Sequence, residues 1–136
     1  MEFREKVARL EQLKHLRREV DALSQRIAEL EQASAGGSGR IAGMPRCPKG
    51  GGYAGEYGEK LAGLRAMLEA RRLRCMEELG RLYAFIDDIP DSFLRQIFTC
   101  RYIDGDTWQR VAFRVGNTDE QIPRKLHNRY LERADL

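Results

Sequence analysis

A heptad pattern near the N-terminus constrains the fold more than any other feature of the sequence. Leucine, valine and isoleucine recur at intervals of 3, 4, 3, 4 and 3 residues among mostly charged or polar neighbours, and neither glycine nor proline interrupts residues 2–33. Such spacing is typical of the apolar seam of paired helices. We therefore predict one long helix over residues 1–33, with a seam that another helix must cover. The seam positions are Leu13, Leu16, Val20, Leu23, Ile27 and Leu30.

A second long helix is predicted beyond a glycine-rich break. Residues 34–58 are rich in glycine and contain Pro45 and Pro48, a composition typical of a linker. Residues 59–90 follow with a broad apolar face, and Pro90 ends the helix because proline disfavours helical geometry in the residue before it. The two helices can pair as a hairpin within one chain or as a coiled coil between chains. We expect self-association through them.

Residues 91–136 are predicted to form three short helices, which makes the whole chain all-α. Asp91 or Ser92 can cap the first helix, which runs to about Tyr102. Thr107 can cap the second helix, 108–115, and Gly116 follows it as a terminating glycine. Thr118 and Gln121 have the capping-box spacing that would open the third helix. The predicted core of the last two helices is Val111, Val115 and Ile122, and His127 is predicted to be a surface or phosphate-side residue.

The last helix is basic although the net charge of the chain is only +3. Two helices joined by a short turn containing glycine, the second of them basic, are the outline of a helix-turn-helix, so we expect binding to double-stranded DNA. The alternative is that these charges form an ordinary solvated helix face. The predicted base-reading residues are Gln121, Arg124, Lys125 and Asn128, and the predicted phosphate contacts are Thr107, Gln109, Arg110 and Arg129.

The same region resembles a known family. The run RQIFTCRYIDGDTWQRVAFRVGNTDEQIPRKLHNRYL, and Leu94 to Gly116 in particular, is similar to the C-terminal region of phage and prophage late transcription regulators of the RinA and ArpU type. That region of the family is similar in turn to the promoter-reading fourth region of bacterial sigma factors. The resemblance implies a transcriptional regulator of phage or prophage late genes that acts with host RNA polymerase.

Two residues depart from the usual motif. Asn117 occupies a turn position that is commonly apolar, and Pro123 falls within the expected recognition helix. If that helix starts near Asp119, Pro123 would produce a kink, whereas a start near Ile122 would make it a favourable first-turn residue.

Other functional classes have weaker support in the sequence. No pairing of nucleophile and base, metal-ligand spacing or cofactor loop is present, so we interpret the chain as a non-enzymatic protein without metal or cofactor. The odd number of cysteines, the charged N-terminus and the lack of a long apolar segment predict a cytoplasmic protein without membrane contact. Two alternatives to the regulator remain: a phage terminase small subunit, or an interaction module that docks on RNA polymerase without contacting DNA.

Overall fold

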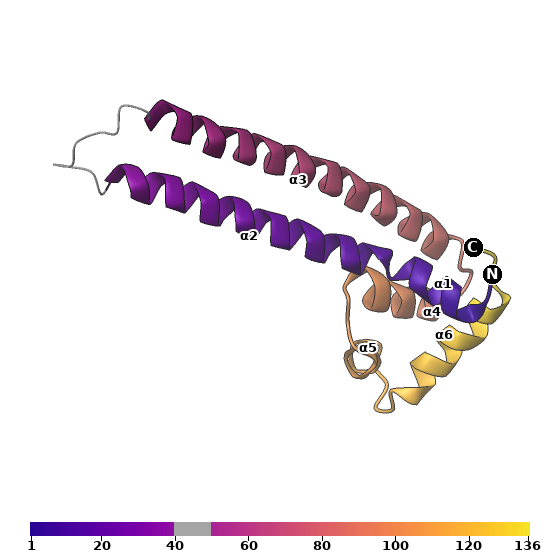
Figure 1. Ribbon diagram of the computed structural model, residues 1–136. Coiled ribbons are helices and arrows are strands. Elements are labelled where there is room, and N and C mark those ends of the chain that lie inside the picture. Colours follow the sequence, from indigo (N-terminus) through magenta and orange to yellow (C-terminus); the bar gives the residue numbers. More distant parts are fainter. Residues whose placement is uncertain (40–49) are drawn as a thin grey trace. The chain divides into compact units, whose positions relative to one another are not determined.

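The computed structural model describes residues 1–39 and 50–136, and the side chains of residues 1–33 and 55–136. Every regular element in these residues is a helix, which confirms the all-α prediction (Figure 1). The elements are α1 (Phe3–Leu10), α2 (Gln12–Gly39), α3 (Gly50–Asp87), α4 (Ser92–Phe98), the π-helical turn η1 (Thr99–Ile103), α5 (Trp108–Arg114) and α6 (Gln121–Arg133). The chain divides into two compact units: the hairpin unit, residues 17–74, and the helix-turn-helix unit, residues 1–16 with 75–136.

The boundaries of the long helices differ from the prediction. The single helix predicted over 1–33 is interrupted at Glu11, where apolar residues follow one another at three-residue steps through Val7, Leu10, Leu13 and Leu16. In a continuous helix each three-residue step falls short of a full turn, so these side chains would drift around the helix axis. The turn at Glu11 offsets this drift and keeps Leu10 and Leu13 on the same core.

The predicted linker, 34–58, is too long at both ends. Helix α2 continues to Gly39 and α3 already begins at Gly50, and residues 40–49 lie outside the described residues. Glycine weakens a helix by only about 1 kcal/mol per residue, and extending an existing helix is easier than starting one. A glycine-rich composition therefore does not by itself end a helix.

In the hairpin unit, α2 and α3 run antiparallel and cover each other's apolar faces. Leu23 and Ile27 of the predicted seam pack against Leu68 of α3. Two ion pairs follow the same antiparallel order: Arg71 Nε lies 2.6 Å from Glu19 Oε2, and Arg65 Nη2 lies 2.7 Å from Glu31 Oε1. The seam of α2 is thus covered within the chain, as in the hairpin alternative.

The helix-turn-helix unit has a core built from both ends of the chain. Leu10 and Leu13 from the N-terminal helices and Leu131 from α6 share one cluster with residues of α3, α4 and η1, and the two termini lie near each other (Figure 1). The end of the second long helix therefore packs on the C-terminal helices, and α1 contributes to the same core. The remaining members of the cluster are Leu82, Ile86, Ile89, Phe98, Tyr102 and Ile103.

Lys6 ties α1 to the end of α6. Its buried ammonium donates hydrogen bonds to the carbonyl oxygens of Leu131 (3.1 Å), Glu132 (3.3 Å) and Ala134 (2.6 Å). The last carbonyls of a helix have no partner within the helix, and a cation at this end is favourable. Lys6 therefore serves as the C-terminal cap of α6, supplied from the opposite end of the sequence.

Candidate nucleic-acid interface

Helices α5 and α6 pack together as the two helices of the predicted motif. The Thr107 hydroxyl accepts a hydrogen bond from the Arg110 backbone N–H at 3.3 Å, which confirms the predicted cap. Gly116 has a φ of 84°, in the left-handed region that glycine adopts without strain, and so reverses the chain after α5 as predicted. Residues 115–120 then lead into α6 at Gln121.

Two predictions for the start of α6 are wrong. The side chain that accepts from the helix N-terminus is that of Asp119, whose Oδ1 lies 3.0 Å from the Gln121 backbone nitrogen, and not that of Thr118. Ile122, predicted to be core, is 47% exposed, and the fully buried Pro123 takes that place. The long turn shifts the buried stripe of α6 by one residue, which is a rotation of about 100°. Pro123 lies in the first turn, where a missing N–H removes no intrahelical bond.

His127 is buried, which corrects its predicted surface position. It is 2% exposed and lies with its ring 4.8 Å from the ring centroids of both Phe98 and Trp108. Its Nε2 lies 2.5 Å from the Tyr102 hydroxyl, and its Nδ1 lies 2.8 Å from Asn128 Oδ1. The amide oxygen can only accept, so Nδ1 carries the proton and Nε2 accepts from the tyrosine. Burial lowers the pKa of His127 to about 4 and raises that of Tyr102, so both groups stay neutral near pH 7.

The four predicted base-reading residues share one face of α6. Gln121, Arg124, Lys125 and Asn128 have the spacing i, i+3, i+4, i+7, which places them within an arc of about 100°. The buried stripe of Pro123, His127 and Leu131 occupies a separate arc of the helix, which borders this one on the side of Arg124. We call these four residues the reading face. Three of them are exposed; Asn128 is half-buried, and its oxygen is occupied by His127.

The reading face is basic and has few competing partners. Among the described residues, no carboxylate forms an ion pair with Arg124, Lys125 or Arg129. The predicted phosphate contacts divide between two elements: Thr107, Gln109 and Arg110 lie exposed at the start of α5, and Arg129 lies exposed on α6. Three of the four predicted phosphate contacts are thus apart from the reading face, whereas Arg129 lies on the same helix, one turn after Lys125.

Phe113 was missed by the sequence analysis. This α5 side chain is 83% exposed, and no role was predicted for it. The helical spacing of α5 contained the signal, because Phe113 lies one turn after the polar residues Gln109 and Arg110 and away from the buried Val111.

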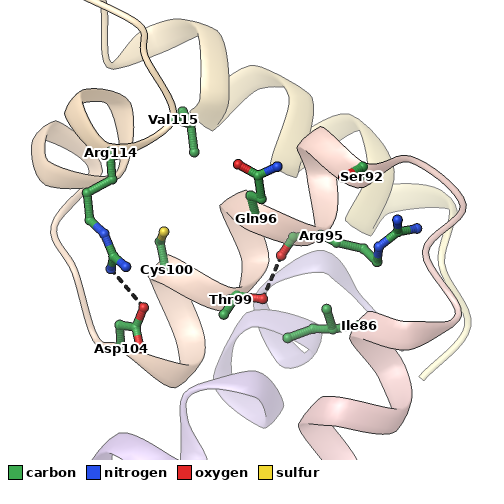
Figure 2. Close-up of a pocket in the computed structure, with 9 residues that line it drawn as sticks. All are labelled: Ile86, Ser92, Arg95, Gln96, Thr99, Cys100, Asp104, Arg114 and Val115. Atoms are coloured by element: carbon green, nitrogen blue, oxygen red, sulfur yellow. Dashed lines mark hydrogen bonds and ion pairs between the residues drawn. The ribbon is translucent and has the colours of Figure 1, made fainter.

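A pocket of about 390 Å³ in the helix-turn-helix unit is lined by residues of α3, α4, η1 and α5 (Figure 2). Gln96, Cys100 and Val115 face its interior, and Asp104 and Arg114 lie at its edge. Burial raises the pKa of the Cys100 thiol, so the thiol is protonated near pH 7. The interior of the pocket therefore presents a neutral thiol, an amide and an aliphatic side chain, and the charged residues Arg95, Asp104 and Arg114 complete its lining.

Asp104 at the edge of this pocket and the nearby Asp106 already have a cationic partner. Cys100, Asp104 and Asp106 place their potential metal-ligand atoms within 4.8 Å of one another. Arg114 Nη1, however, lies 2.7 Å from Asp104 Oδ2 and 2.5 Å from Asp106 Oδ2. A metal ion would have to displace this guanidinium, so we interpret the cluster as a structural support that joins α5 to the preceding turn.

Comparisons with known proteins do not add to these observations. No protein-family model matches the chain, and no match was found among curated proteins or among solved structures. The resemblance to late regulators thus stays a prediction. Among the described residues, no helix has both the length and the apolar character that crossing a membrane requires.

Proposed function

We propose that this protein is a sequence-specific, non-enzymatic DNA-binding regulator of phage or prophage late genes that acts with host RNA polymerase. The observation that carries the proposal is the reading face, where amide and basic side chains share one arc, next to the buried stripe, of a helix that follows a glycine turn. Arginine and lysine can bind guanine edges in the major groove, and glutamine and asparagine can bind adenine. The resemblance of residues 94–131 to late regulators supports the genetic context.

A salt titration on two duplexes tests the proposal. The double substitution Arg124→Ala with Lys125→Ala should weaken binding to a duplex selected from a random library by about 1–3 kcal/mol per lost base contact and relax base preference. Arg110→Ala should weaken binding to selected and random duplexes alike and lower the salt slope by about one unit. A matched control, Lys14→Ala with Arg18→Ala, removes the same charge from exposed positions on α2.

The outcomes separate the alternatives. If the Arg124/Lys125 variant binds both duplexes as the wild type does, the recognition-helix assignment is wrong. If the wild type binds no DNA in low salt but is retained on immobilised RNA polymerase, the interaction-module alternative replaces the regulator. The exposed Phe113 would then be the first residue to replace, because a large exposed apolar side chain is typical of a protein contact.

We also propose self-association through the outer face of α3. The α2 seam is covered within the chain, whereas Met76 (70% exposed) and Tyr83 (52% exposed) lie seven residues apart on one face of α3. Light scattering should give the mass of a dimer, and Tyr83→Lys should give that of a monomer. A wild-type monomer would contradict self-association, and a ring of many subunits would favour the terminase alternative.

A further inference from the structure

Two neighbouring carboxylates precede the reading face, and they differ in what they contact. Asp119 is engaged locally, because its Oδ1 accepts the Gln121 backbone N–H at 3.0 Å. Glu120 is exposed and forms no capping hydrogen bond. Among the described residues, no ion pair or hydrogen bond engages its carboxylate. Only one of the two acidic side chains is therefore available to a ligand.

The backbone places Glu120 at the border between the reading face and the buried stripe, about 40° outside the arc of the reading face on the side of Arg124. Its φ of −63° and ψ of −22° are already helical, so Glu120 continues the spacing of α6 by one residue toward the N-terminus. It precedes Gln121 directly and lies one turn before Arg124. In a helix-turn-helix, the residues at the N-terminal end of the recognition helix are those that reach base edges.

A carboxylate at this position restricts what DNA the face can accept. It is repelled by phosphates and, when ionised, can only accept hydrogen bonds. In the major groove, the amino group of cytosine is the donor that glutamate matches, because adenine places the N7 acceptor next to its amino group. An acidic residue among basic ones therefore lowers affinity for unmatched DNA and favours a sequence with a donor at this position.

We propose that Glu120 is a specificity-determining residue that accepts a hydrogen bond from the amino group of a cytosine in the major groove. This inference rests on the proposed DNA-binding function, and it specifies cytosine as the base that the site should prefer at the position facing Glu120. It predicts a loss of specific binding and a gain of non-specific binding from the same substitution. A residue with a merely structural role would change both in the same direction.

The test compares the full-length wild type with Glu120→Gln on a library-selected duplex and on a random duplex of equal length. Glu120→Gln should weaken binding to the selected duplex by about five- to fiftyfold and strengthen binding to the random duplex by about two- to fivefold. Repeating the selection with Glu120→Gln should change the preference at one position from cytosine to adenine, because glutamine can bind the adenine edge through two hydrogen bonds.

Glu132→Gln is the matched control. Glu132 is also an exposed carboxylate on α6, but it lies near the opposite end of the helix, so its replacement should leave base preference unchanged. If Glu120→Gln changes binding to both duplexes by the same factor and retains the selected sequence, the inference is overturned while the proposed function stands. If the wild type binds no duplex, the proposed function fails and this inference fails with it.

Discussion

Acidification should destabilise the helix-turn-helix unit through His127. The neutral imidazole is enclosed by Phe98, Trp108 and Tyr102, and the positive charges of Arg101 and Arg124 also disfavour its protonation. The Tyr102 hydroxyl donates to Nε2, so a proton on that nitrogen would also break this hydrogen bond. His127 therefore stays neutral in the fold under conditions in which the unfolded chain binds a proton.

The size of the effect follows from the two pKa values. Burial lowers the pKa of His127 from 6.5 to about 4 in the folded chain. Between these values the unfolded state binds more protons than the folded state, so the free energy of unfolding falls as the pH falls. At about 1.4 kcal/mol per pKa unit, most of this loss, about 2.5 kcal/mol, develops between pH 7 and pH 4.5. Below about pH 4 both states are protonated and the contribution no longer changes.

Urea unfolding at several pH values, followed by circular dichroism, measures this loss. Carboxylates also titrate in this range, so the informative quantity is the difference between the wild type and His127→Gln, which cannot be protonated but can still accept from Tyr102. The wild type should lose about 2.5 kcal/mol more than the variant between pH 7 and about pH 4.5. Parallel stability profiles for the two proteins would refute the buried, neutral histidine.

Three further substitutions test the packing. Leu23→Ala with Ile27→Ala should destabilise the hairpin unit by about 2–5 kcal/mol per residue in thermal unfolding, and an unchanged melting curve would show that the seam is exposed. Pro123→Ala should destabilise by about 1–2 kcal/mol in urea, because it removes fully buried methylenes; a stabilised variant would instead indicate a mid-helix kink. Lys6→Met should cost about 1.5–3 kcal/mol and speed amide exchange in the last turn of α6, whereas the exposed Arg4→Met should do neither.

Local sequence patterns were sufficient for the elements whose causes are local. The heptad spacing determined the α2 seam, and Thr107 and Gly116 determined where α5 begins and ends, because capping and left-handed backbone depend on one or two residues. The reading face followed from helical spacing alone, since the exposed residues of a helix repeat with the same period as its buried ones.

The tertiary structure alone decided which residues meet across the chain. From its spacing alone, the last helix could have packed with either Ile122 or Pro123 in the core. The length of the preceding turn determines how the helix is rotated, and in that rotation Pro123 and His127 are buried. In the sequence nothing distinguishes Lys6 from the other four lysines; only the fold, through α1, places its ammonium at the end of α6. The periodicity of a sequence indicates which positions of one helix share a face. Only the packing of distant segments determines which face is covered and which polar groups form hydrogen bonds with each other.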